Sequence, residues 1–269
     1  MTYAQVLRRR EQIAVQGGEI DVVIDAPRND PGPSLVLLPS SQRDSLDFDA
    51  VAHALALRGH RVLRPQPRGM GRTTLPLDHL TLHVLAQDVI DTVYALGDGR
   101  AVLVGHAFGH FIARVADLDH PRCVRGVVVA GAAARVFPAG MAESLDIASD
   151  ARQPEDLRRA HLQRAFFAPG NDPGAWLEGW HPELRALYRA AGAVPAKDRW
   201  WTVAHAPLLD LQGANDPWRP PASRAELQDL LGADRVTVQV IDQASHALVV
   251  EQPVAVAGAI ARWVAGLPP

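Results

Sequence analysis

The chain has 269 residues, 48% of them hydrophobic and 21% charged, which is enough apolar material for a sizeable globular core. Its formal net charge of −3 gives no electrostatic basis for binding nucleic acid or an anionic membrane, so we expect neither as a partner. Cys123 is the only cysteine, which excludes an intramolecular disulfide and fits a reducing compartment.

The N-terminal stretch, residues 1–11, is charged and is not followed by the apolar core of ~7–15 residues that a secretory signal requires. No apolar run approaches the ~20 residues needed to span a bilayer. We therefore expect a cytoplasmic protein, a monomer or homodimer, that acts on a small molecule.

Strands and helices alternate along the first half of the chain. Two short strands at 13–15 and 20–24 are joined by Gly17-Gly18, which is a hairpin signal. The pattern then predicts strands at 35–38, 62–63, 102–104 and 127–131, with helices at 47–57, 82–96 and 111–116 between them. This alternation implies right-handed crossovers and a mostly parallel sheet.

The alternation stops between residues 132 and 201, where we predict helical pieces at 155–167 and 182–191 and no strand. Four of the six tryptophans fall here, which favours a lid over a pocket or a helical subdomain with a small core of its own; the two are compatible. Alternation resumes with strands at 208–213 and 236–241 and helices at 223–231 and 254–264. We therefore predict an α/β core domain, residues 1–131 and 202–269, with a helical cap insertion, residues 132–201.

The strand at 102–104 runs into Gly105-His106-Ala107-Phe108-Gly109 and then a helix. This is the pattern of the G-x-S-x-G turn, in which a strained strand-to-helix connection lifts one side chain above a parallel sheet. The two glycines are needed because neighbouring backbone approaches too closely for a Cβ. The lifted residue in this chain is Ala107, whose methyl group cannot attack a carbonyl.

Further motifs accompany this turn, and with it they make the chain resemble the α/β-hydrolase fold family over nearly its whole length. They are similar to the family's R-G-x-G-x-S loop, its G-x-x-D acid turn and its histidine loop, namely Arg68-Gly69-Met70-Gly71-Arg72, Gly213-Ala214-Asn215-Asp216-Pro217, and Ser245-His246-Ala247 followed by Glu251-Gln252-Pro253. The order of turn, acid and histidine is the order that this fold uses.

The resemblance implies a dyad in which Asp216 accepts a hydrogen bond from Nδ1–H of His246 and stabilises its imidazolium form. It also implies an oxyanion hole made by the backbone N–H groups of Phe108 and Ser41. Without this context, His246 would be interpreted as a loop histidine with satisfied hydrogen bonds and Asp216 as the start of an Asx turn.

Two other histidines flank the turn residue. His106 precedes it and is expected to be structural, and His110 has no assigned role. Two departures from the family pattern stand out: Ala107 replaces the expected serine, and Pro39-Ser40 replaces a frequent His-Gly pair. A natural branch with G-H-A-F-G and an engineered Ser→Ala change both remain open, and the second departure favours the natural branch.

These residues predict an enzyme in which the dyad activates water, or removes a substrate proton, without a serine nucleophile. One alternative is a serine hydrolase, esterase-like, inactivated at position 107. Another is a non-catalytic binding protein that keeps the pocket. Relocation of the nucleophile to Ser40 or Ser41 is disfavoured, because neither lies on a recognisable strained turn.

The aromatic content of the insertion predicts a largely apolar substrate. Candidate substrate-binding residues are Ser40, Arg43, Trp176 and Trp200, with Phe166-Phe167 adding apolar surface. Arg43 follows the oxyanion loop, where it would either hold a carboxylate or lie exposed on the surface. The sequence contains no metal-ligand cluster, phosphate-cradling loop or dinucleotide fingerprint, so we expect no cofactor and no metal.

Overall fold

The computed structural model describes residues 6–28 and 32–268, so the start of the N-terminal stretch lies outside the described residues. Its centre is an eight-stranded sheet in the order β1-β2-β4-β3-β5-β6-β7-β8. The strands are β1 (Val6–Val15), β2 (Gly18–Pro27), β3 (Gly32–Leu38), β4 (His60–Pro65), β5 (Ala101–His106), β6 (Val124–Ala130), β7 (Leu208–Gly213) and β8 (Val236–Ile241).

The β1–β2 hairpin is antiparallel, β2 pairs antiparallel with β4, and every other neighbouring pair is parallel. The predicted hairpin is confirmed, but its strands are longer than expected. Charged residues hid the extent of β1, where Arg8 pairs with Asp25 at 2.7 Å and Arg10 with Asp21 at 2.5 Å. Ion pairs across the hairpin let a highly charged segment form an edge strand.

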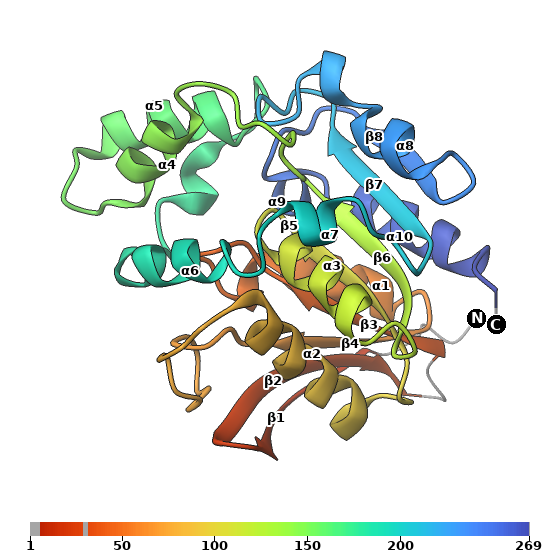
Figure 1. Ribbon diagram of the computed structural model, residues 1–269. Helices are drawn as coiled ribbons and strands as arrows, with labels where there is room; N and C mark the ends of the chain where they lie inside the picture. The colour runs from red at the N-terminus through yellow and green to blue at the C-terminus, as the bar shows by residue number, and fades with distance from the viewer. Residues whose placement is uncertain (1–5, 29–31, 269) are drawn as a thin grey trace.

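Helices cover both faces of the sheet, with α1 and α10 on one face and α2, α3 and α8 on the other (Figure 1). The helices are α1 (Asp49–Ala56), α2 (Leu82–Leu96), α3 (Gly109–Asp119), α4 (Met141–Ser149), α5 (Glu155–Ala165), α6 (Arg185–Ala191), α7 (Asp198–Trp201), α8 (Glu226–Leu231), α9 (Leu248–Glu251) and α10 (Pro253–Ala265). This is the α/β architecture that the alternation predicts, a mostly parallel sheet between two helical layers.

The central strand β5 shows why its sequence is continuously apolar. All six of its residues are buried. Leu103 packs with α2 and α3, whereas Val102 and Val104 pack with α1 and α10 on the opposite face. A parallel strand between two helical layers needs apolar side chains in both directions.

Several boundaries differ from the prediction. The helix expected at 47–57 begins as a 3-10 turn over Ser45–Phe48, and the one expected at 223–231 is preceded by a 3-10 turn over Pro221–Ser223. The pattern also missed α4, α7 and α9, two of which have only four residues. A helix of one turn is too short to show a 3.6-residue period.

Residues 132–201 connect β6 to β7 through α4, α5, α6 and α7, and this fully described segment has no strand, as predicted. In Figure 1, α4, α5 and α6 lie at the side of the molecule away from the two chain ends. Aromatic residues of this segment, including Phe166, Phe167 and Trp176, form a third apolar cluster with Trp218. The segment therefore packs around a small apolar cluster that is separate from the two clusters of the sheet and that includes Trp218 from the loop after β7.

Buried arginines bind the irregular backbone of this segment. Nε of Arg158 donates to the carbonyl of Ala148 at 3.0 Å, and its Nη2 donates to Leu177. Arg114 of α3 donates to the carbonyls of Trp200 and Trp201 at 3.0 and 2.8 Å. Side-chain donors thus satisfy carbonyls that have no ladder partner.

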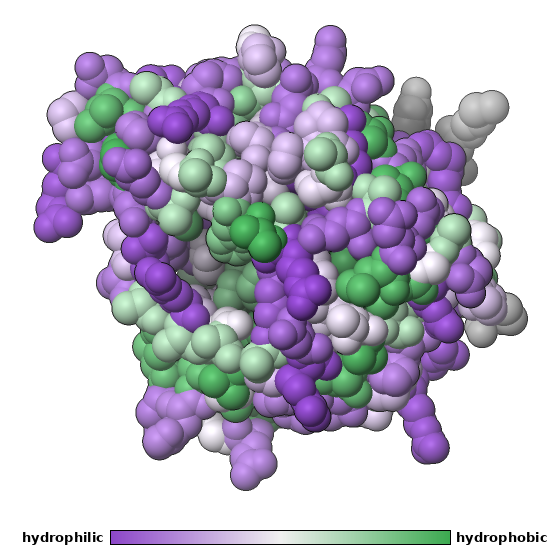
Figure 2. Space-filling model, turned by 45° about the horizontal axis from the view of Figure 1, so that its top comes forward, coloured by the Kyte–Doolittle hydropathy of each residue, from purple (hydrophilic) through white to green (hydrophobic). Residues whose placement is uncertain are grey.

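On the face drawn in Figure 2, apolar areas are broken up by hydrophilic side chains. Within the described residues, no helix has both the length and the apolarity to cross a bilayer.

Candidate active site

The turn between β5 and α3 has the strained geometry that the sequence predicts. Ala107 has φ +46°, in the left-handed region that side chains rarely adopt. A Cβ on Gly105 would lie 2.3 Å from the backbone nitrogen of His110, and one on Gly109 would lie 2.2 Å from the carbonyl oxygen of Leu38. Both flanking glycines are therefore required for the turn to pack against β3 and α3.

His246 and Asp216, from the loops after β8 and β7, are brought together as predicted. Nδ1 of His246 lies 3.0 Å from Oδ2 of Asp216, and both side chains are buried. The other carboxylate oxygen of Asp216 accepts from the backbone N–H of Trp218 at 2.8 Å, so the Asx turn is present as well. The indole of Trp218 stacks on the imidazole of His246, with ring centroids 5.1 Å apart. The carboxylate and the indole together hold the imidazole in one orientation.

His106 lies beneath the histidine loop. Its Nε2–H donates to the carbonyl of His246 at 2.8 Å. Burial, reinforced by the proximity of His246, lowers the pKa of His106 to about 4, so the ring is neutral at pH 7. A neutral, fully buried ring bonded to the loop backbone agrees with the structural role expected from the sequence.

Glu251 ties the histidine loop to residues 165–171. Its carboxylate accepts from the N–H groups of Ser245 and Ala168, each at 2.6 Å, and from Nδ2 of Asn171 at 2.7 Å. Burial raises the pKa of this carboxyl. The sequence marked Glu251 as part of the histidine loop motif, but its partners on the insertion were not predictable from spacing.

A cavity of about 380 Å³ lies between the turn, the histidine loop and the insertion. It brings together most of the predicted site residues, namely Ser40, Ser41, Arg43, Ala107, Phe108, Trp176 and His246. Asp216 is not among the lining residues, because it lies behind the imidazole. Phe166, Trp180 and Trp218 extend the apolar wall. The position of Trp218, two residues after Asp216, is the signal by which it could have been found.

The prediction that Trp200 binds substrate needs correction, and for Arg43 the alternative of an exposed surface position is wrong. Trp200 does not line the cavity: α7 returns the chain to α3, where the indole is fully buried against Phe111, 4.9 Å between ring centroids. Arg43 is not an exposed surface arginine, since it is 5% exposed. Its guanidinium binds Asp47 at 2.9 Å and the carbonyl of Glu178 at 2.6 Å, so it is engaged within the protein.

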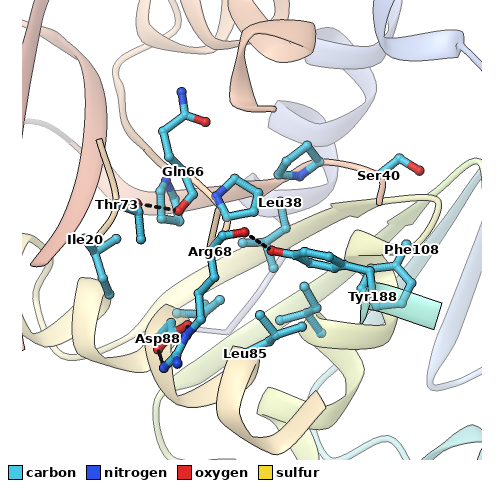
Figure 3. A pocket seen from close by; sticks show the side chains of 15 residues that line it. Ile20, Leu38, Ser40, Gln66, Arg68, Thr73, Leu85, Asp88, Phe108 and Tyr188 are labelled. Atoms are coloured by element: carbon cyan, nitrogen blue, oxygen red, sulfur yellow. Dashed lines mark hydrogen bonds and ion pairs between the residues drawn. The ribbon is translucent and has the colours of Figure 1, made fainter. Parts of the chain in front are cut away.

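Phe108, which follows Ala107 in the turn, packs against Tyr188 of α6. A smaller cavity of about 40 Å³ separates it from the loop after β4, and Tyr188 of α6 closes one side (Figure 3). The hydroxyl of Tyr188 donates to the carbonyl of Arg68 at 2.8 Å, and its ring packs edge-on against Phe108. Arg68 is itself fixed by two bonds to Asp88, at 2.7 and 2.8 Å. Among the described residues, the N–H groups of Phe108 and Ser41 donate no hydrogen bond.

The sheet order, the strained turn and the acid–histidine pair define the class to which this protein belongs. Residues 35–259 match the model of the alpha/beta hydrolase family, and the chain is a member of that family.

Named relatives and solved structures agree with this assignment. The chain is 29% identical over 195 residues to an epoxide hydrolase of Caballeronia sordidicola, covering 65% of this chain and 58% of that protein. It is 30% identical over 115 residues to epoxide hydrolase B of Mycobacterium tuberculosis, covering 42% of this chain and 32% of the relative. Each match thus spans less than two thirds of the relative's length.

Among solved structures, a thermophilic esterase of Thermogutta terrifontis superposes with a TM-score of 0.74 at 20% identity, covering 96% of this chain and 98% of the other. At that identity the likeness shows the fold.

Proposed function

We propose that this chain is a hydrolase in which His246, oriented by Asp216, activates a water molecule for direct attack on a small, largely apolar ester-type substrate. The observation that carries this proposal is that His246 and Ala107 line the same cavity while Nδ1 of His246 is held 3.0 Å from the carboxylate of Asp216. This leaves Nε2 as the ring nitrogen that receives a proton.

The reaction needs no covalent bond between the enzyme and the substrate. A water molecule, whose share of liquid volume is ~30 Å³, binds between the methyl group of Ala107 and Nε2 of His246. Its oxygen attacks the carbonyl carbon while Nε2 takes one of its protons. The N–H groups of Phe108 and Ser41 stabilise the oxyanion of the tetrahedral intermediate. As this intermediate collapses to the carboxylic acid, the bond between the carbonyl carbon and the alkoxide oxygen breaks, and the leaving alkoxide takes the proton from the imidazolium. General-base assistance of this kind contributes ~10²–10⁴-fold.

In this proposal residues 132–201 act as a cap over the substrate. Phe166, Trp176 and Trp180 of this segment line the cavity together with the turn, so an apolar substrate body would be enclosed between cap and core. The cap also carries Tyr188, which packs against Phe108, the donor proposed for the oxyanion.

One observation favours a second candidate, a serine hydrolase that lacks its nucleophile. Ala107 retains φ +46°, the strained conformation that serves to present a nucleophile. In that case Ala107→Ser would restore acyl-enzyme chemistry.

The test compares the unaltered chain, Ala107→Ser and His246→Ala on short-chain p-nitrophenyl esters, with ligand binding measured in parallel. His53→Ala, an exposed histidine on α1, is the matched control. The proposal predicts turnover by the unaltered chain that falls roughly 10²-fold or more in His246→Ala and not in the control. A fluorophosphonate probe is expected to add mass to Ala107→Ser only.

Other outcomes decide against the proposal. No turnover by the unaltered chain, with fast turnover by Ala107→Ser, would establish the second candidate. Ligand binding that neither variant changes, without turnover by any of them, would overturn both and leave a binding protein.

A further inference from the structure

The charged side chains that line the main cavity are of one sign. Arg43, Arg185 and Arg189 contribute to its wall, and within the described residues no aspartate or glutamate does. This imbalance occurs in a chain whose formal net charge is −3. Arg43 is buried and held by both Asp47 and the carbonyl of Glu178, whereas the guanidinium groups of α6 are more exposed and have at most one carboxylate partner. The arginines of α6 are therefore the charges available to a ligand.

Arg185 and Arg189 are four residues apart on α6, so their side chains emerge on the same face of the helix. Arg185 forms an ion pair with Asp146 of α4, which connects the two helices at the rim of the cavity. Arg189 is exposed and forms no ion pair within residues 6–28 and 32–268. Ala142 and Leu145 of α4 also line the cavity. The rim between α4 and α6 therefore combines an unpaired guanidinium with one that a single carboxylate holds.

The chemistry of this arrangement favours an anion with an apolar body. A guanidinium presents a planar fork of donors that matches both oxygens of a carboxylate. Farther inside, the rings of Phe166, Trp176 and Trp180 offer apolar surface. An apolar ligand of that kind carrying a carboxylate at one end would satisfy both parts of the wall.

We propose that the cavity takes an amphiphilic organic anion, whose apolar body lies against the aromatic wall and whose carboxylate is held at the rim by Arg185 and Arg189. The ligand carboxylate takes the place of Asp146 at Arg185 and brings Arg189 into a second bond. The inference rests on the proposed function, because it names the substrate class of the same site.

The test measures calorimetric binding of phenylbutanoate and of its neutral isostere phenylbutanamide. We expect the unaltered chain to bind the carboxylate about tenfold more tightly than the amide. The double variant Arg185→Gln, Arg189→Gln should reduce this ratio to within about twofold, leaving amide affinity unchanged. Arg185→Lys keeps the charge without the fork and should fall between. Arg199→Gln, an exposed arginine outside the cavity, is the matched control.

Equal affinity of the unaltered chain for both probes would overturn the inference, as would a carboxylate preference that survives the double variant. A preference abolished by His246→Ala would also overturn it, because the anion would then lie at the dyad. Absence of ester turnover together with an arginine-dependent preference would sink the proposed hydrolysis and leave the anion site standing, so the two failures are distinguishable.

Discussion

The sheet core and the segment of residues 132–201 differ in the side chains that fill their interiors and in how their backbone polar groups are hydrogen-bonded. In the core, strands such as β5 carry aliphatic side chains on both faces and pair their backbone groups in a ladder. The segment between β6 and β7 has no ladder; aromatic rings fill its interior, and arginines such as Arg158 and Arg114 bind its carbonyls. Stability in the core is therefore distributed over many equivalent contacts, whereas in the insertion it depends on a few multivalent side chains.

The largest effect is expected in the core. Leu103→Ala in β5 removes a fully buried side chain and should lower the free energy of unfolding by about 4 kcal/mol, because the surrounding strands collapse only partly around the cavity. Leu57→Ala, the same change at a residue that is 46% exposed, is the control. Urea unfolding measures both, and losses within about 1 kcal/mol of each other would contradict a rigid core.

The insertion should respond to the loss of one arginine. Arg158→Met keeps the apolar stem but leaves the carbonyls of Ala148 and Leu177 without their donor, at a cost of about 3 kcal/mol. Hydrogen exchange should show faster opening of α4 and α5 and little change in β5 and β6. Arg159→Met removes only solvent-exposed ion pairs and should be nearly neutral. An equal loss of exchange protection in α4, α5, β5 and β6 would contradict this difference between the insertion and the core.

His106 lies where the two regions meet, since its ring contacts both His246 and Trp176. The pKa of His106 is about 4 in the folded protein, whereas its ordinary value of 6.5 applies to the unfolded chain. Between these pH values the unfolded chain therefore binds more protons than the folded one. The stability it contributes is complete above pH 6.5 and is lost as pH falls toward 4, by about 2 kcal/mol between pH 7 and pH 5.

His106→Gln should remove this part of the pH dependence, while His53→Gln, an exposed histidine, should retain it. Unfolding free energies of the three proteins at pH 7 and pH 5 are the measurement. Parallel pH dependence in all three would show that His106 protonates freely in the fold.

The smallest effect concerns the contact of α6 with the core. Tyr188→Phe deletes the hydrogen bond to the carbonyl of Arg68 and should cost about 1 kcal/mol, because that carbonyl loses a buried donor. Tyr94→Phe, at a residue that is 64% exposed, removes a contact between the hydroxyl and Sγ of Cys123 at 3.1 Å and should cost less. Thermal unfolding measures both variants, and equal melting temperatures would mean that the bond from Tyr188 stabilises the fold no more than the exposed contact of Tyr94 does.

The accuracy of the sequence analysis follows the same division. The predicted bounds of α2, β7 and β8 agree with the structure at both ends, because apolar residues mark each element and turn residues flank it. The pairing of Asp216 with His246 followed from the resemblance to the family's acid turn and histidine loop, and it fits the physical rule that the loops after parallel strands meet at one edge of a sheet. In contrast, the burial of Trp200 and the partners of Arg43 depend on how the insertion folds back, which no local period encodes.

The hydrogen bonds from Ala168 and Asn171 to Glu251 determine where the insertion can be exchanged for that of another family member. Further bonds join the same stretch to the core, with Ala247 donating to Phe166 at 2.8 Å and Trp218 to Ala165 at 2.7 Å. Residues 165–171 therefore belong to the scaffold of the histidine loop. A chimera that exchanges the insertion for a foreign one should keep this stretch and place its crossover points on either side of it.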